Sequence, residues 1–123
     1  VVPGSMGSPG FIVRGKGNAE SFNSCSHGAG RVMSRAAAFR TLKHADMKKI
    51  LKEQGISLIG GTLDESPEVY KDINKVIDGQ RDLVDVLAKF EPKLVRMAAE
   101  GNQWGNKKKK KKPENKGDGD VCM

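Results

Sequence analysis

The sequence predicts an α+β fold in which short strands alternate with two or three helices. Strands are indicated by short β-branched runs bounded by glycine, and helices by stretches whose apolar residues recur every three or four positions. The chain has 123 residues, of which 37% are hydrophobic but only 5% aromatic. The core must therefore consist mainly of Val, Ile, Leu and Met, and it is modest, because a chain of this size buries roughly 65% of its unfolded surface.

Strands are predicted at three places. Phe11–Arg14 is a β-branched run between glycines, and Ile56–Ile59 ends at a glycine pair. Val84–Phe90 alternates as a strand does, although its apolar residues also suit a helix, and we predict a strand. Val1–Gly10 is rich in turn formers and predicts a loop, and Gly15–Asn18 predicts a hairpin turn.

Helices are predicted at Arg31–Leu42, Ala45–Gln54 and Ile73–Asp78, where helix-forming residues occur without Pro or Gly. Asp72 is suited to cap the last of these. The first helix would begin inside a glycine-rich segment and place Gly28–Arg31 near its N-terminus, where the helix dipole favours anions.

Positive charge is concentrated at one end of the chain. The formal net charge is +7, and the stretch Lys107–Met123 carries seven Lys against three acidic residues. Its block of six lysines repels itself and is followed by Pro, Gly and Asp, which predicts a disordered basic tail. We therefore expect a folded part at residues 1–98 and a disordered tail at 99–123.

The sequence also suggests where the protein acts. Its two cysteines are nearly a hundred residues apart, which does not resemble a disulfide framework. No apolar run approaches the roughly 20 residues needed to span a bilayer, and the N-terminus does not resemble a signal peptide. We expect a soluble, cytoplasmic protein, and a start at Val1 rather than Met suggests a fragment.

The most informative segment is Ser24-Cys25-Ser26-His27-Gly28-Ala29-Gly30-Arg31. Glycines let a ligand approach the backbone closely, and exposed N–H groups can form an anion-binding nest. Arg31 can offer a planar fork of donors to phosphate, and His27 can attack phosphorus. The alternative is a tight turn with a packed histidine, because one such motif is a weak signal.

Together with Pro3-Gly4-Ser5-Met6-Gly7, Met33-Ser34-Arg35 and Tyr70-Lys71-Asp72, this segment resembles the C-terminal part of RtcB-type RNA-splicing ligases, the RNA 3′-phosphate ligases. The resemblance runs from Val1 to about Met97. Several motifs in the same order are far more specific than any one of them. The fold it implies is the C-terminal fragment of the RtcB ligase fold.

The resemblance implies a GTP- and Mn²⁺-dependent ligase used in tRNA splicing and RNA repair. Such an enzyme joins RNA 3′-phosphate or 2′,3′-cyclic phosphate ends to 5′-hydroxyl ends, with His27 as the catalytic residue that carries GMP. Arg31 is implied as a phosphate clamp or a structural pair. The implied partners are tRNA halves or broken RNA, GTP and the remainder of a ligase chain. The implied nucleotide-binding residues are Pro3, Gly4, Ser5, Met6, His27, Gly28, Ala29 and Gly30.

The chain departs from the family pattern in two respects. The family holds Mn²⁺ with a cysteine and histidines upstream of this segment, and neither Cys25 nor His44 is a suitable substitute, so we expect no metal ligand here and no activity of the fragment alone. Met97 stands where the family often has a guanine-contacting lysine, which leaves Arg96, Lys93 or no residue for that contact. The alternative function is a non-catalytic basic RNA-binding module or a remnant that lacks the metal site.

Overall fold

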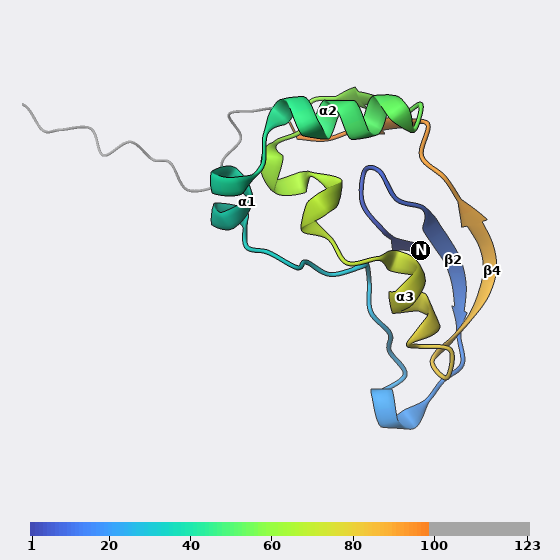
Figure 1. Ribbon diagram of the computed structural model, residues 1–123. Coiled ribbons are helices and arrows are strands. Elements are labelled where there is room, and N and C mark those ends of the chain that lie inside the picture. Colours follow the sequence, from blue (N-terminus) through green and yellow to red (C-terminus); the bar gives the residue numbers. More distant parts are fainter. Residues whose placement is uncertain (99–123) are drawn as a thin grey trace, which may run out of the picture.

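The computed structural model describes residues 1–98, and the predicted tail, residues 99–123, lies outside them (Figure 1). The described chain is a mixed α+β structure, as predicted, and it has three α-helices and two small sheets. None of its helices is long and apolar enough to cross a lipid bilayer. The elements in chain order are β1 (Val2–Pro3), β2 (Gly10–Gly15), the 3-10 helix η1 (Ala19–Ser21), α1 (Arg35–Thr41), α2 (His44–Glu53), β3 (Ser57–Ile59), the 3-10 helices η2 (Leu63–Glu65) and η3 (Pro67–Val69), α3 (Ile73–Asp78), β4 (Val84–Phe90) and β5 (Leu94–Arg96).

The first sheet is antiparallel, with the strand order β1-β2-β4, and α3 packs on one of its faces (Figure 1). Strands β2 and β4 pair along their whole lengths, with a register shift between Ile12 and Val13. Apolar residues from β1, β2, α3 and the glycine-rich loop form one core between helix and sheet. Its buried members are Val2, Phe11, Ala29, Ile73 and Ile77.

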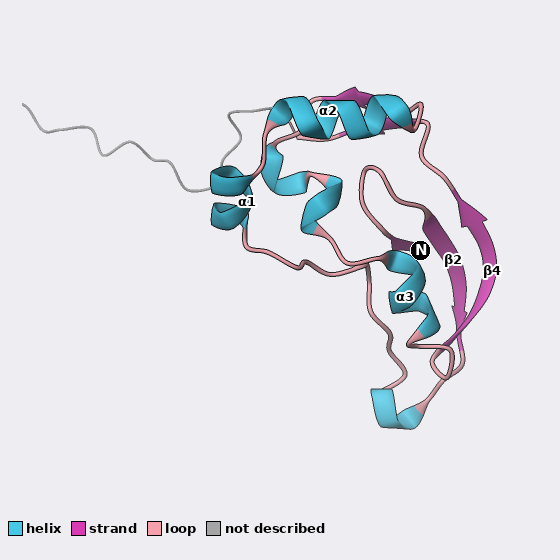
Figure 2. Cartoon of the chain, viewed as in Figure 1, coloured by secondary structure: helices cyan, strands magenta, loops and turns pink. Residues whose placement is uncertain are grey.

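The second sheet is the parallel pair of β3 and β5, and α2 lies along it (Figure 2). A second core lies between them, with Met6, Met47 and Leu51 fully buried. Met6 comes from the turn between β1 and β2, so this turn links the two cores.

The predictions from local pattern are confirmed at most elements. Helices α2 and α3 and strands β2, β3 and β4 occur within one or two residues of their predicted ranges, and the Asp72 side chain caps α3. Strands β1 and β5 have two and three residues, too few for a periodicity to be seen. The predicted loop Val1–Gly10 therefore contains β1. The predicted hairpin turn at Gly15–Asn18 is wrong, because β2 pairs with β1 and β4 and the chain after Gly15 leads to η1.

The predicted start of the first helix is wrong. Helix α1 begins at Arg35, because the Ser34 side chain accepts a hydrogen bond from the Ala37 N–H and caps it. Arg31 instead forms an isolated antiparallel bridge with Tyr70. Gly28–Arg31 is thus extended or turning chain rather than a helix N-terminus, and the dipole argument for anion binding there does not apply.

Candidate functional site

His27 lies at the surface of the loop that connects η1 to the Arg31 bridge. Its side chain is exposed and forms no hydrogen bond or ion pair with any residue of the described range 1–98. A histidine packed to hold a turn would be buried and hydrogen-bonded, so the alternative of a structural histidine finds no support in these contacts. Both ring nitrogens are open to a ligand.

The Pro3 and His27 motifs are neighbours in space, although more than twenty residues separate them in the chain. The Ala29 N–H donates a hydrogen bond of 3.1 Å to the Pro3 carbonyl oxygen, and Ala29 itself is buried. A Cβ atom on Gly28 would lie 3.3 Å from that same oxygen. Close approach of the two backbones therefore favours a residue without a side chain at position 28.

In the turn after Pro3, Ser5 is half-buried and the side chain of Met6 is buried. The Ser5 hydroxyl accepts from the Gly7 N–H at 3.2 Å and shares a hydrogen bond of 2.8 Å with the Ser8 hydroxyl. The Met6 side chain is 4% exposed and points into the core below α2. Pro3 thus lies beside the His27 loop, Gly4 and Ser5 belong to the turn that follows it, and the side chain of Met6 contributes packing.

Gln80 supports the other side of the loop. Its side-chain oxygen accepts hydrogen bonds from the Ser26 N–H at 3.1 Å and from the Ser26 hydroxyl at 3.2 Å. Gln80 is 5% exposed and comes just after α3. Sequence reasoning missed it, because a lone glutamine after a helix carries no signal of a partner 54 positions away.

Arg31 binds protein atoms. Its Nε donates to the Met33 carbonyl at 3.1 Å and its Nη1 to the Asp64 carbonyl at 2.8 Å, and its guanidinium lies 5.5 Å from the centre of the Tyr70 ring. Its Nη2 is buried without a hydrogen-bond partner among residues 1–98. These contacts favour the structural pair over the phosphate clamp, since most of the donor fork is already occupied.

A polar network that the sequence did not reveal surrounds Arg31. Asp64 is buried, which acts to raise its pKa, but hydrogen bonds from Thr62 and Arg35 outweigh burial and lower the pKa of Asp64 below its ordinary value. Burial, together with the 2.7 Å hydrogen bond that the Tyr70 hydroxyl donates to Glu65, raises the pKa of Tyr70. Asp64 is therefore ionised and Tyr70 neutral at physiological pH.

Lys71 places a cation beside the loop. Its N–H donates to the Gly30 carbonyl at 2.9 Å, and its Nζ lies 3.9 Å from where a Cβ on Gly30 would be. Gly30 has a φ of +78°, a conformation that suits glycine. The exposed Lys71 ammonium is thus close to the loop in which a phosphate ligand is expected.

The described residues do not fit a manganese site. Nowhere in the range 1–98 do three His, Cys, Asp or Glu side chains gather closely enough to hold a metal ion. Cys25 is a free, exposed thiol, and His44 begins α2. We therefore derive no metal-dependent step from these residues.

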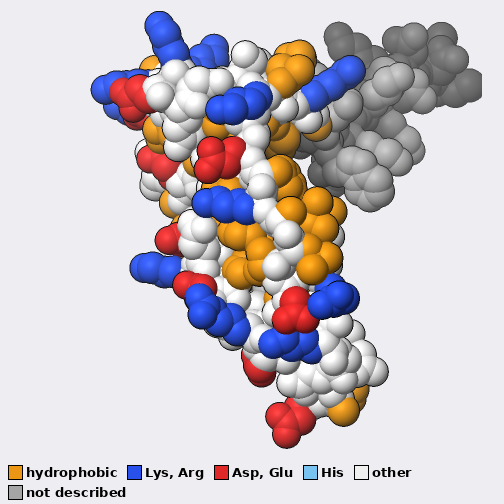
Figure 3. Space-filling view, turned by 90° about the vertical axis from the view of Figure 1, so that its right-hand side faces the viewer, with side chains coloured by type: hydrophobic (Ala, Val, Ile, Leu, Met, Phe, Trp, Pro, Cys, Tyr) orange, Lys and Arg blue, Asp and Glu red, His pale blue; other side chains and the backbone are white. Residues whose placement is uncertain are grey.

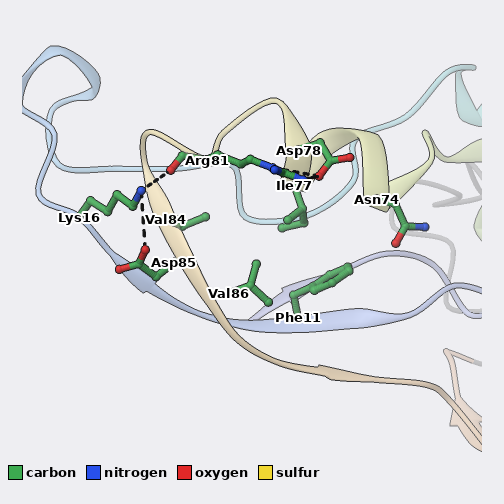
Figure 4. A pocket seen from close by; sticks show the side chains of 9 residues that line it. All are labelled: Phe11, Lys16, Asn74, Ile77, Asp78, Arg81, Val84, Asp85 and Val86. Atoms are coloured by element: carbon green, nitrogen blue, oxygen red, sulfur yellow. Dashed lines mark hydrogen bonds and ion pairs between the residues drawn. The ribbon is translucent and has the colours of Figure 1, made fainter.

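A hollow of about 520 Å³ opens elsewhere, between α3 and the sheet of β2 and β4 (Figure 4). Its charged groups are satisfied by one another: Lys16 donates to the Arg81 carbonyl at 2.5 Å and pairs with Asp85, and Arg81 pairs with Asp78. None of the site residues predicted from sequence lines it. The lining residues are Phe11, Lys16, Asn74, Ile77, Asp78, Arg81, Val84, Asp85 and Val86.

The side of the molecule that carries β4 has a continuous apolar area, seen as the hydrophobic side chains near the centre of Figure 3. Ile12, Leu87 and Phe90 are each more than 40% exposed. Apolar surface of this kind on a sheet is typical of a contact with further protein.

Comparison with known proteins matches these motifs to one family. The family model described as tRNA-splicing ligase RtcB matches residues 1–98. The RNA-splicing ligase RtcB of Escherichia coli K12 is 48% identical over 87 residues, which cover 71% of this chain and 21% of the relative. The tRNA-splicing ligase RtcB of Nanoarchaeum equitans is 36% identical over 103 residues, covering 77% and 22%, and that of Archaeoglobus fulgidus is 45% identical over 84 residues, covering 63% and 17%. The chain thus spans about a fifth of the length of these curated relatives.

Proposed function

The chain belongs to the RtcB family of tRNA-splicing ligases, and we propose that it is the nucleotide-accepting part of an RNA ligase. Such a ligase joins RNA 3′-phosphate or 2′,3′-cyclic phosphate ends to 5′-hydroxyl ends and consumes GTP. The observation that carries the proposal is the state of His27: an exposed imidazole without a partner in the described chain, in a loop held from both sides.

The proposed first step uses the lone pair of the neutral His27 imidazole. A ring nitrogen attacks the α-phosphorus of GTP, a nitrogen–phosphorus bond forms, and the bond to the β-phosphate oxygen breaks so that pyrophosphate leaves. The GMP then passes to an RNA 3′-phosphate, and attack by an RNA 5′-hydroxyl on that activated end releases GMP and completes the join.

Residues beside His27 support nucleotide binding at this place. The Ala29 to Pro3 hydrogen bond brings the two motifs together, and Pro3 and Gly30 on either side of it are exposed. The Lys71 ammonium adds a positive charge next to Gly30, which favours phosphate. Guanosine recognition by Ser5 is part of the same proposal.

The remainder of a ligase chain would supply what these residues lack. Two observations support a larger protein around this segment: the chain spans about a fifth of the length of the relatives, and the apolar face over β4 is exposed within residues 1–98. Mn²⁺ would be held there. Because the loss of one preorganised donor can cost about 10²–10³ in rate, we expect the isolated chain not to ligate RNA. We place the complete enzyme in the cytoplasm, acting on tRNA halves or broken RNA.

The proposal is tested in a chimeric ligase, defined as the Escherichia coli relative in which residues 1–98 of this chain replace the matching segment. Incubation with α-labelled GTP and Mn²⁺ should label the chimeric ligase covalently, and His27→Ala or His27→Gln should abolish the label. His44→Ala, the matched control, should leave it unchanged. Labelling that persists in His27→Ala contradicts the proposal, and a chimeric ligase that folds but neither labels nor joins RNA supports a non-catalytic module instead.

A further inference from the structure

Gln80 is a buried polar side chain at the base of the His27 loop. It is 5% exposed, and its backbone is fixed between α3 and β4, because its carbonyl accepts from the N–H groups of Leu83 and Val84 at 3.0 and 3.2 Å. Its side-chain oxygen accepts hydrogen bonds from the N–H and the hydroxyl of Ser26, the residue directly before His27.

The contact fixes the orientation of the Gln80 amide. A backbone N–H can only donate, so the group that faces the Ser26 N–H must be the amide oxygen. The Nε2 at the other end of the amide is buried and has no hydrogen-bond partner within residues 1–98. An unpaired buried donor is unfavourable, and an apolar side chain of similar shape would avoid it. What glutamine contributes here is therefore its oxygen, held against Ser26.

The His27 loop is thus fastened one residue before and two residues after the histidine. Gln80 holds Ser26, and the Pro3 carbonyl holds the Ala29 N–H at 3.1 Å. His27 has no bond of its own to set its direction among the described residues. The position of its imidazole depends on where these two hydrogen bonds hold the backbone.

We propose that Gln80 is a positioning residue for His27: its side-chain oxygen holds Ser26 so that the imidazole is aimed at the α-phosphorus of GTP. The inference rests on the proposed function of His27. In-line attack tolerates little displacement, and a misplacement of about 1 Å can lower a rate about 100-fold. Gln80 touches neither nucleotide nor RNA in this account and acts only through the loop.

A role in stability alone would make a different prediction. If Gln80 only supported the fold, any substitution would reduce labelling in proportion to the protein that unfolds, and the rate per folded molecule would stay constant. In a positioning role, the labelling rate per folded molecule does not follow stability. It depends on whether position 80 has an oxygen acceptor, rather than on the free energy of unfolding.

Two variants make the distinction in the chimeric ligase. Gln80→Met keeps the length and volume of the side chain but removes the oxygen, and Gln80→Glu keeps an oxygen acceptor while placing a charge in a buried position. Gln54→Met, at an exposed glutamine in the C-cap of α2, is the matched control. The readouts are the single-turnover rate of His27 labelling per folded molecule, the KM for GTP in labelling, and hydrogen exchange of the Ser26 amide.

We expect Gln80→Met to exchange the Ser26 amide at least about 10-fold faster, and to label about 10-fold to 100-fold more slowly with little change in the KM for GTP. Gln80→Glu should label faster than Gln80→Met although it is the less stable of the two, and Gln54→Met should match the unsubstituted protein. Labelling rates that follow stability, or an unchanged Ser26 exchange rate in Gln80→Met, overturn the positioning role. If the unsubstituted chimeric ligase carries no label on His27, the proposed function is wrong, and the positioning role is overturned with it.

Discussion

His27 and Arg31 lie four residues apart in one motif, yet their side chains have opposite environments. His27 is exposed and makes no hydrogen bond or ion pair within residues 1–98, while Arg31 is half-buried, donates to two backbone carbonyls and lies over the Tyr70 ring. The sequence suggested phosphate chemistry for both, with a packed histidine and a structural pair as the alternatives. In the structure, the His27 side chain is open to a ligand, and the Arg31 side chain is used in contacts that stabilise the fold.

The difference shows how a loop can be kept in place without any hydrogen bond from its exposed histidine. The loop is fastened through its backbone, at Ser26 and Ala29, and through the network that Arg31 anchors on η2. None of these interactions involves the imidazole. If His27 is the nucleophile, as we propose, chemistry and stability are carried by different residues of the same motif, and substitutions should affect them separately.

The largest effect on stability is expected at Arg31. Arg31→Met would leave the Met33 and Asp64 carbonyls without their charged donor, and hydrogen bonds to charged groups contribute about 1.5–3 kcal/mol each. The unpaired Nη2 offsets part of this, so we expect a loss of about 2–4 kcal/mol in the free energy of unfolding of the 123-residue chain. Urea unfolding checks it. Arg31→Lys should recover little, because a point charge cannot serve both carbonyls; an Arg31→Met variant of unchanged stability would remove the contrast with His27.

The next effect concerns Asp64 and depends on pH. Because the pKa of Asp64 is lowered in the folded chain, its carboxylate contributes stability that is fully present above its ordinary value near 3.9 and is lost as the pH falls through the folded value. Asp64→Asn should therefore destabilise by about 1.5–3 kcal/mol at pH 7, and the difference should shrink below about pH 4. Urea midpoints at several pH values measure it, with the exposed Asp82→Asn as control. A difference that does not change with pH would mean that the charge of Asp64 has no part in the network.

A smaller effect is expected at Ser34, which sets where the motif ends and α1 begins. Ser34→Ala removes the cap on the Ala37 N–H and should cost about 1 kcal/mol, whereas Ser34→Gly should cost only a few tenths. Thermal unfolding of the two variants is the measurement. Equal losses for Ala and Gly would argue that the side-chain cap is not what fixes the start of the helix.

The smallest effect on stability is expected at His27 itself. His27→Ala at an exposed side chain without partners should change the free energy of unfolding by less than about 0.5 kcal/mol. The same urea experiment as for Arg31→Met gives the comparison directly. A loss above 1 kcal/mol would indicate a packed histidine and weaken the distinction between the two residues.

Much of the fold could be predicted because the signals are local. Apolar spacing located α2 and α3, and alternation located β4. Strands β1 and β5 were missed, because two and three residues are too few to show an alternation, and β5 pairs with a strand that lies far away in the chain. The start of α1 was misplaced because helix propensity does not distinguish Val32 and Met33 from true helix, whereas the Ser34 cap and the Arg31 to Tyr70 bridge do.

The nearness of two motifs could be predicted, whereas their binding of a nucleotide stays a prediction. Recognising the motifs placed Pro3 and His27 in one site, and the structure brings them together through the Ala29 hydrogen bond. The supports of the site were not predictable, because Gln80 and Asp64 act through contacts across 54 and 33 positions of the chain. Contacts of this kind leave no trace in spacing or composition.

The central claim is that His27 carries GMP, and the most direct measurement is to locate the adduct in the unsubstituted chimeric ligase. After reaction with GTP, peptide mapping by mass spectrometry should find GMP on His27. The bond should be lost in acid and retained in base, because protonation of the phosphoramidate nitrogen makes imidazole a good leaving group. GMP found on a lysine such as Lys71, or an adduct stable to acid, would contradict the account.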